Sequence, residues 1–290
     1  MLVDLRVNER ALRVSQQKSD TIVGLDAWKK LGYDAVAIEQ RASLNLDDAR
    51  EADAFAEKRK RPKEIKSLGL DVRRRITVVL NASAGEFGAR PNSDSNRRGL
   101  ILLKVLRCLS SMYDIVAVEP TSQESFGAVM SMLRVPSSSD YDLCARDVLD
   151  IIAIDVLPPR CPFRMSSSAM LRLRQLGVFV ECCYRSAVAS MGDKTNERVL
   201  RSRFIGNGRA ATAHISKGHM KRHGNCPNFI LSSGAHEPRE ARNAAEVCSM
   251  CQLIGLSERA AQAVVFSSGE SLLRAAQARR TLALPAAVPA

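Results

Sequence analysis

The sequence predicts a single α/β domain of the barrel type, in which about seven parallel strands are surrounded by helices. Short runs rich in β-branched residues recur along the chain, and several are apolar at nearly every position, as strands covered on both faces are. Helical patterns lie between these runs, so strand and helix alternate. The sequence has no glycine-rich dinucleotide fingerprint, which favours a closed or nearly closed barrel over an open doubly wound sheet.

The strands are expected where short apolar runs begin and end sharply. The runs "YDAVAI", "RITVVL", "YDIVAV" and "DIIAID" share a polar entry followed by valine, isoleucine and alanine or leucine. The first run of the set is "LVDLRV" and the last is "NFILSS". The predicted strands cover residues 2–7, 33–38, 75–80, 113–118, 150–155, 178–183 and 228–233.

A helix is expected between most neighbouring strands. Gly32 ends one apolar helical pattern and Gly177 ends another, and a strand follows each glycine at once, as in βα units. Ser122 opens a further helical pattern. The predicted helices cover residues 21–32, 98–111, 122–134, 166–177, 239–256 and 257–265.

Three charged or polar stretches interrupt this alternation and are predicted to be loops. Residues 41–74 end in a basic cluster, residues 84–97 are rich in Gly, Asn and Ser, and residues 215–227 combine histidine with lysine and arginine. We therefore expect one barrel domain over residues 1–280 with these loops as insertions. A flexible tail is expected over residues 281–290.

The charge of the chain favours an anionic partner. The chain has 43 Lys and Arg residues against 31 Asp and Glu residues, which gives a net charge of +12. Most of the excess is arginine, whose planar guanidinium group binds phosphate in a bidentate way. The simplest alternative is a soluble protein with a basic solvated surface. A nucleic-acid partner is the more specific hypothesis, although few aromatic residues are available to stack on bases.

Other features of the sequence predict an intracellular protein without a membrane partner. The first residues, "MLVDLRVNE", lack the basic start and long apolar core of a secretory signal. No stretch reaches the length of about 18 apolar residues that a membrane span needs. The eight cysteines are scattered, several of them in apolar runs, as is typical of reduced thiols.

Signals for a metal site are weak. His219, His223 and Cys226 could join Cys248 and Cys251 in a zinc site. However, a single C-x-x-C is little evidence, and the last two cysteines lie in a helical apolar pattern that core packing explains. No predicted strand carries a histidine, which argues against the metal centre of a barrel hydrolase. We expect the protein itself to bind no cofactor.

Two hypotheses fit the stretch "NFILSSGAHEPREAR": it contains a serine nucleophile, or it forms an anion site. Ser232 and Ser233 do not lie in a G-x-S-x-G pattern, so a nucleophile has little support. Gly234 permits a tight turn after the strand, and backbone amides at such turns bind phosphate. Arg239 and Arg242 follow, and other basic clusters lie at strand edges and in loops, which favours a distributed phosphate-binding surface.

The ordered motifs resemble a known family. They are "DLRV", "LGYDAVAI", "RRITVVL", "YDIVAVEP", "DIIAIDV" followed by "PF", "FVECCY", "ISKG", "NFILSSGA" and "LIGLSERAAQAVV", spread over most of the chain. In this order they resemble the TIM-barrel protein subunit shared by eukaryotic and archaeal ribonuclease P and by ribonuclease MRP. The resemblance implies a TIM-barrel-like fold, in agreement with the strand and helix pattern.

The resemblance also implies a function. Ribonuclease P removes 5′ leaders from precursor tRNA, and the MRP particle processes pre-ribosomal RNA. The RNA subunit would hold the catalytic Mg²⁺ ions, whereas this protein would support the RNA and pair with a small ferredoxin-like subunit. The particle RNA, indirectly precursor tRNA, and other particle subunits are then the expected partners, and the expected location is the nucleus, in particular the nucleolus. A free-standing barrel hydrolase acting on phosphate esters is the alternative, and a barrel that binds only proteins is a third possibility.

The resemblance implies RNA contacts only at matching positions. These expected RNA-binding residues are Arg75, Arg164, Arg203, Lys217 and Arg242. The chain departs from the family pattern at Thr121, where a lysine often stands, so one contact is in doubt. It also reads "NAAEV" after Arg242 where the family usually has "x-P-x-D-V".

Overall fold

The computed structural model describes residues 1–8, 21–48, 50, 54–55, 69–82, 91–134, 148–189, 194–213 and 228–283. Lys217 and the predicted loop at 215–227 lie outside these ranges, as do residues 284–290 of the predicted tail. Residues 281–283, which were expected in the tail, are the last residues of a helix. None of the helices in these ranges is both long and apolar enough to cross a membrane.

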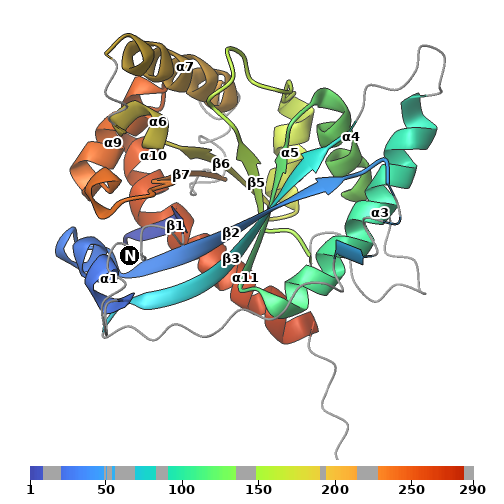
Figure 1. The fold of residues 1–290 in the computed structure, drawn as a ribbon, viewed down its shortest axis with the longest axis horizontal. Helices are drawn as coiled ribbons and strands as arrows, with labels where there is room; N and C mark the ends of the chain where they lie inside the picture. Colours follow the sequence, from blue (N-terminus) through green and yellow to red (C-terminus); the bar gives the residue numbers. More distant parts are fainter. Residues whose placement is uncertain are drawn as a thin grey trace, which may run out of the picture.

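Seven parallel strands form one sheet in sequence order, which confirms the predicted fold class. They are β1 (Val3–Asn8), β2 (Ala35–Asn45), β3 (Asp71–Asn81), β4 (Ile115–Pro120), β5 (Ile151–Ile154), β6 (Phe179–Cys183) and β7 (Phe229–Ser232). The sheet curls until its first and last strands meet. Val7 forms a parallel bridge with Ala235, and the backbone N–H of Asn8 donates to the Ala235 carbonyl at 2.9 Å. The result is a nearly closed barrel with helices outside it (Figure 1).

Strands β2 and β3 are longer than predicted. They pair in parallel from Ala35 opposite Asp71 to Asn45 opposite Asn81. Residues 41–45 and 71–74, which were expected in a loop, therefore belong to the sheet. Burial alternates along the end of β2, with Ala42 and Leu44 buried and their neighbours exposed. This alternation is typical of a strand with one solvated face, and the charge of the segment obscured it.

The helices follow the predicted alternation with three additions, one of them only four residues long. They are α1 (Thr21–Lys30), α3 (Pro91–Met112), α4 (Gln123–Met132), α5 (Ser167–Gln175), α6 (Arg185–Val188), α7 (Lys194–Thr212), α9 (Ala244–Leu253), α10 (Glu258–Ala263) and α11 (Gly269–Ala283), with η3 (Pro238–Glu240) and η4 (Val264–Ser268). The sequence pattern did not predict α6, α7 or α11. Residues 91–97 were expected in a loop and begin α3, and the helix predicted over 239–256 is a short turn followed by α9.

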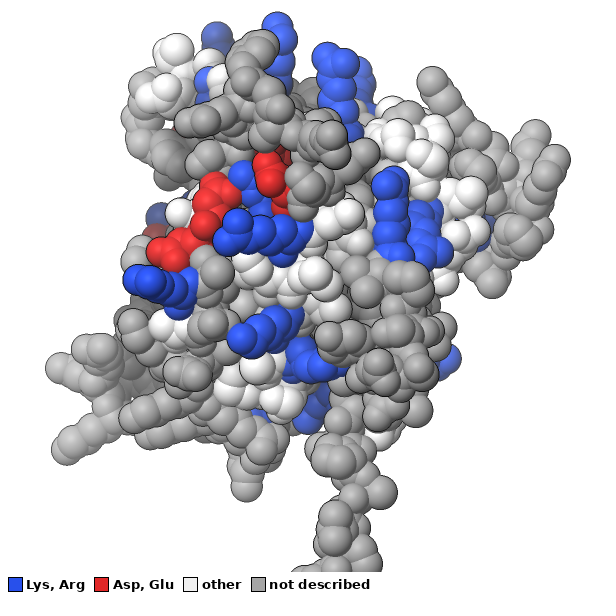
Figure 2. Space-filling view, turned by 90° about the vertical axis from the view of Figure 1, so that its right-hand side faces the viewer, with Lys and Arg blue, Asp and Glu red and all other residues white. Residues whose placement is uncertain are grey.

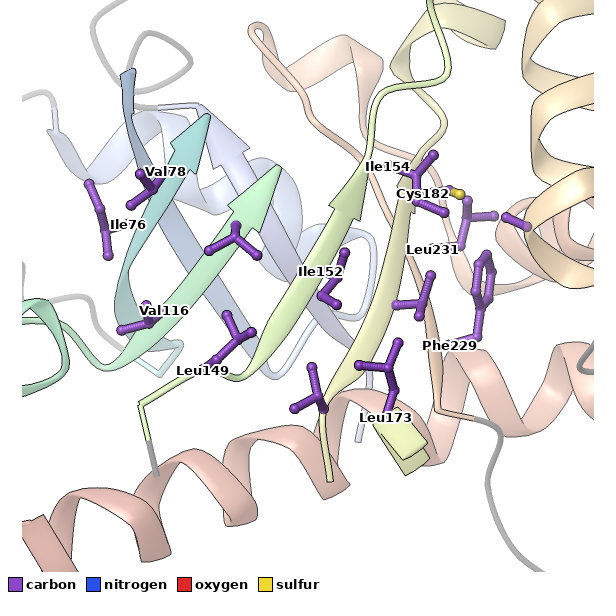
Figure 3. Packing of buried hydrophobic residues seen from close by; sticks show 14 of the residues in the cluster. Ile76, Val78, Val116, Leu149, Ile152, Ile154, Leu173, Cys182, Phe229 and Leu231 are labelled. Carbon is purple, nitrogen blue, oxygen red and sulfur yellow. The ribbon is translucent and has the colours of Figure 1, made fainter. Parts of the chain in front are cut away.

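The main core lies between the outside of the barrel and the helices. Its outward-facing strand residues include Ile76, Val78, Val116, Ile152, Ile154, Phe229 and Leu231, and Leu173 of α5 belongs to the same cluster (Figure 3). Trp28 of α1 is also completely buried, and its indole N–H donates to the Asp4 carboxylate at 2.8 Å. Each strand turns alternate side chains towards the helices. Burial of this apolar layer between strands and helices stabilises the barrel.

Helix α11 packs against a second, smaller core inside the barrel. The cluster contains Leu5, Ala37, Ile115, Ala117, Ile151, Phe179 and Ile230 from the strands, together with Leu272 and Ala276 from α11. Figure 1 shows α11 running beneath the strands. Arg279 binds α11 to the residue before β5, because its Nε and Nη2 atoms donate to the two oxygens of Asp150 at 3.0 and 2.8 Å. The carboxyl ends of the strands therefore form the other mouth of the barrel.

Candidate nucleic-acid interface

A network of buried ion pairs fills the barrel towards the carboxyl ends of its strands. Glu39 of β2, Glu119 of β4 and Glu181 of β6 point to Arg6 of β1. The Arg6 guanidinium lies 2.8 Å from Glu39, 2.8 Å from Glu119 and 3.8 Å from Glu181. Burial alone would raise the pKa of Glu39, but the nearby charges of Arg6 and Arg75 outweigh burial and leave that pKa below its ordinary value. Glu39 therefore stays ionised and paired with Arg6.

Arg75 belongs to this network, which corrects its predicted role. Its Nη1 and Nη2 atoms donate to the two oxygens of Glu181 at 2.6 and 2.5 Å, and its side chain is 0% exposed. A further N–H donates to the Leu5 carbonyl at 2.8 Å. Because the guanidinium is enclosed and bonded to Glu181, Leu5 and Thr77, a contact between Arg75 and RNA does not fit this structure.

The two serines at the end of β7 also form hydrogen bonds inside the barrel. The Ser232 hydroxyl donates to Glu181 at 2.7 Å, and the Ser233 hydroxyl donates to the Arg6 carbonyl at 3.2 Å. Gly234 then turns the chain with a φ of 63°, and an added Cβ would lie 3.2 Å from the Cys183 side chain. The tight turn is as predicted, and the Ser233 hydroxyl stabilises the closure between β1 and β7, whereas the Ser232 hydroxyl links β7 to β6.

The mouth of the barrel retains a small cavity of about 180 Å³. Arg41 lies at its rim and forms an ion pair with Glu119, and Arg185 forms one with Glu240 at 3.0 Å. Within the described ranges, no three His, Cys, Asp or Glu side chains are placed to hold a metal ion. The charged groups Arg6, Glu39, Arg41 and Glu119 in the lining of this cavity bind one another.

A larger groove of about 660 Å³ lies between α4 and α5 on the outside of the barrel. Its lining comes from α3, α4, the segment before α5, and α5 itself: Ser95, Gln123, Phe126, Gly127, Met130, Ser131, Arg134, Arg164, Ser166, Ser168, Ala169, Leu171, Arg172 and Gln175. We call it the α4–α5 groove. It is distinct from the mouth of the barrel, because the residues that line the two do not overlap.

Local contacts fix the shape of the α4–α5 groove. The backbone N–H of Arg164 donates to the Gln123 side chain at 2.8 Å, which ties the segment before α5 to the first turn of α4. The rings of Phe126 and Phe163 stack with centroids 4.4 Å apart. The Ser166 hydroxyl accepts the N–H of Ala169 and caps α5. The groove is therefore formed by packed elements rather than by free loops.

Three arginines give the α4–α5 groove its positive charge. Arg134 and Arg164 are exposed, and neither guanidinium group has a hydrogen-bonded or ion-paired partner among the residues that the structure describes. Arg172 donates to the Leu133 carbonyl at 3.1 Å. Unpaired guanidinium groups in a concave site bind phosphate readily, because no internal carboxylate competes for their N–H donors.

The remaining predicted contacts lie elsewhere. Arg203 of α7 donates to the Leu157 carbonyl at 3.0 Å, and Arg242 donates to the carbonyls of Arg239 and Ala241 at 2.7 and 2.9 Å. Both retain some exposure but do not line the α4–α5 groove. Of the predicted residues within the described ranges, the structure places Arg164 alone in it.

Arg134 and Arg172 were not predicted as binding residues. Each belongs to an apolar helical pattern, "SMLR" or "MLRLR", near whose end a basic residue is ordinary.

Figure 2 views the side of the molecule that lies to the right in Figure 1, where α3 and α4 are found. Lys and Arg side chains are spread over this face, whereas the visible Asp and Glu side chains gather in one area. The charge on this side of the molecule is thus compatible with an anionic partner.

Comparison with known proteins supplies one informative match. A family model described as RNase P subunit p30 matches residues 1–281. Among solved structures, a crystal structure of a protein described only as uncharacterized is similar at 11% sequence identity, covering 94% of this chain and 74% of that one with a TM-score of 0.49. A likeness at that level carries no argument about function.

Proposed function

Because the chain belongs to the RNase P subunit p30 family, we propose that it binds the RNA of the ribonuclease P particle as a scaffold subunit. In this role it supports the removal of 5′ leaders from precursor tRNA, while the RNA subunit holds the catalytic Mg²⁺ ions. Membership in the family implies association with the particle and its RNA. What we propose beyond this is the scaffold role and the surface that binds the RNA.

The observation that carries this proposal concerns Arg134 and Arg164 in the α4–α5 groove, whose guanidinium groups have no partner among the residues that the structure describes. Phosphate contacts supply most of the affinity of such a surface and little sequence preference. Arg203 and Arg242 are proposed as further, weaker contacts, since a guanidinium that donates to backbone carbonyls still has other N–H groups to offer. Lys217 remains a proposed contact outside the described residues.

The ion pairs in the barrel support a scaffold rather than a catalyst. Barrel enzymes place reactive groups at the carboxyl ends of the strands. Here Glu39, Glu119 and Glu181 occupy that region and are bound by Arg6, Arg41 and Arg75. Carboxylates paired in this way stabilise a shape, because their oxygens already accept hydrogen bonds from guanidinium groups and are not offered to a substrate.

Further assignments of the family are proposed on the same basis. They are a small ferredoxin-like protein partner, a second role in the ribonuclease MRP particle and pre-ribosomal RNA processing, and location in the nucleus and nucleolus. The resemblance of the motifs supports them. Recovery of particle RNAs by sequencing after pull-down of the protein would separate ribonuclease P from MRP.

The experiment that tests RNA binding is a salt titration with the full chain and the particle RNA. We expect Arg134→Gln and Arg164→Gln each to weaken binding and to reduce the slope of log affinity against log salt by about 1. Arg274→Gln is the matched control, because Arg274 is exposed on α11 and already bonded to Glu270. Unchanged slopes for both groove variants would remove the α4–α5 groove from the proposal.

The alternative function, a free-standing hydrolase of phosphate esters, predicts a different result. The isolated protein would then hydrolyse a phosphodiester in the presence of divalent metal ions, and a substitution at the mouth of the barrel would abolish turnover. Such turnover, together with the absence of any structured RNA in the pull-down, would overturn the scaffold proposal.

A further inference from the structure

We infer that the α4–α5 groove holds an unpaired nucleotide of its RNA, with the base against an apolar wall and the phosphate on the arginines. This inference rests on the proposed RNA-binding function and goes further, because it specifies the kind of RNA that the site accepts. A surface that only neutralises phosphates would accept a duplex equally well. The composition of the α4–α5 groove indicates that it contacts a base as well as neutralising phosphate charge.

The apolar wall of the α4–α5 groove consists of one exposed side chain, Leu171, and of Phe126, Met130 and Ala169, which also belong to the main core. Leu171 lies on α5 and is 45% exposed, although it lines a concave site. Met130 and Ala169 line the same site next to the stacked rings of Phe126 and Phe163. The backbone of an RNA duplex has no large apolar face to cover such a wall, whereas an unstacked base does.

The polar part of the α4–α5 groove suits the rest of a nucleotide. Arg134 and Arg164 offer a phosphate guanidinium donors that no other described residue binds. Gln123 accepts the Arg164 N–H through its oxygen, so its amide nitrogen remains a donor for a base edge. Ser131 and Gln175 add groups that can bond a base or a ribose 2′-hydroxyl. The groove volume, about 660 Å³, lies in the range of sites that enclose small organic ligands.

The charge of the groove distinguishes this occupant from most alternatives. Within the described ranges its lining contains three arginines and no carboxylate, so a basic or neutral peptide would leave the guanidinium groups without an anionic partner. An acidic peptide of a partner protein would satisfy the charge, and that occupant is an outcome of the test. An RNA nucleotide supplies an anion, an apolar face and polar edges in one unit, and it agrees with the family of the chain.

The experiment compares a single-stranded RNA and a blunt duplex of the same length by fluorescence anisotropy with the full chain. Leu171→Ser removes the apolar wall without changing charge. Leu100→Ser is the matched control, because Leu100 is 56% exposed on α3 but does not line the groove. We expect Leu171→Ser to weaken single-stranded binding by about fivefold and to leave duplex binding unchanged. Leu100→Ser should alter neither.

Three contrary results are distinguishable. If Arg164→Gln weakens binding of both RNAs while Leu171→Ser weakens neither, the groove binds phosphate without a base, and only this inference is overturned. If neither arginine variant affects any RNA, the groove fails as the RNA-binding surface in the proposed function as well. If Leu171→Ser leaves RNA binding unchanged but releases a protein subunit from the reconstituted particle, the occupant is an acidic peptide, and this inference is also overturned.

A crosslinking measurement is independent of these affinities. A single-stranded RNA that carries 4-thiouridine should crosslink to the peptide that contains Met170 and Leu171, which follows Arg164 in sequence. The same nucleotide placed within a duplex should not. Crosslinks that map only to other peptides would contradict a base in the α4–α5 groove.

Discussion

Arg75 and Glu181 form an ion pair with two parallel hydrogen bonds at the centre of the barrel, and neither side chain is exposed. The residues lie on β3 and β6, so the pair spans the interior between strands that are not neighbours in the sheet. Glu181 also accepts the Ser232 hydroxyl at 2.7 Å. One carboxylate thus joins β3, β6 and β7.

We predict that Arg75→Met destabilises the protein by about 3–5 kcal/mol, because it leaves the Glu181 charge buried with insufficient compensation. The midpoint of urea unfolding measures this loss. RNA affinity per folded molecule should stay at the wild-type value. Adding Glu181→Gln to this variant should recover part of the stability, since the second substitution removes the uncompensated charge. A stable Arg75→Met variant with weakened RNA binding would contradict the buried role.

Arg75 also shows what a sequence pattern predicts and what it leaves open. The apolar run after Arg75 predicts the strand, and the repetition of such runs predicts the barrel. The run "RRR" does not reveal that Arg73 bonds Asp71 and Arg74 bonds Asp114, whereas Arg75 turns inwards. The inward direction depends on a carboxylate 106 residues away in sequence. Long-range pairing of this kind leaves no local signal.

The α4–α5 groove illustrates the same limit. Arg164 was predicted from its resemblance to a family position, but Arg134 and Arg172 belong to other elements and had no such marker. Their proximity follows from the packing of α4 and α5 against adjacent strands. Helix α7 was missed for a local reason, because Gly206 and Gly208 lower the helical preference of its second half. Tertiary contacts of α7 offset that preference.

The two glycines of α7 are predicted to respond in opposite directions to alanine. An added Cβ at Gly206 meets nothing within 4 Å, so Gly206→Ala should stabilise the protein by about 0.5–1 kcal/mol. An added Cβ at Gly208 lies 2.5 Å from a methyl carbon of Ile254, so Gly208→Ala should destabilise it by about 1–3 kcal/mol. Thermal unfolding of both variants tests the helix and its packing together. Equal effects would contradict the orientation of α7.

Helix α11 provides a second matched pair. Arg279 has a side chain 4% exposed and binds Asp150 through two N–H groups, whereas Arg274 on the same helix is 79% exposed and pairs with Glu270. We predict a loss of about 3–5 kcal/mol for Arg279→Ala and less than about 0.5 kcal/mol for Arg274→Ala. Urea unfolding measures both. Similar small losses would show that α11 does not depend on its buried ion pair.

The carboxylate of Asp114 connects α11 to the edge of β3. Its Oδ2 accepts the backbone N–H of Arg74 at 2.8 Å and the side-chain Nε–H at 3.1 Å. Arg280 of α11 forms an ion pair with its other oxygen. Burial tends to raise the pKa of Asp114, but the hydrogen bonds from Arg74 and the charges of Arg280 and Arg74 outweigh it, so the pKa lies below its ordinary value of 3.8.

A lowered pKa gives Asp114 a defined effect on stability. The ionised Asp114 should contribute its full share to the free energy of unfolding above pH 3.8. This share should be lost as the pH falls through the lower pKa of the folded state, because the carboxyl group binds a proton more tightly in the unfolded chain. We predict that the difference in urea midpoint between wild type and Asp114→Asn is constant near neutral pH and shrinks below pH 3.8. Arg280→Met should move this decline to higher pH, since it removes one of the charges that lower the pKa. A difference that grows on acidification would reverse the sign and contradict the ion pairs.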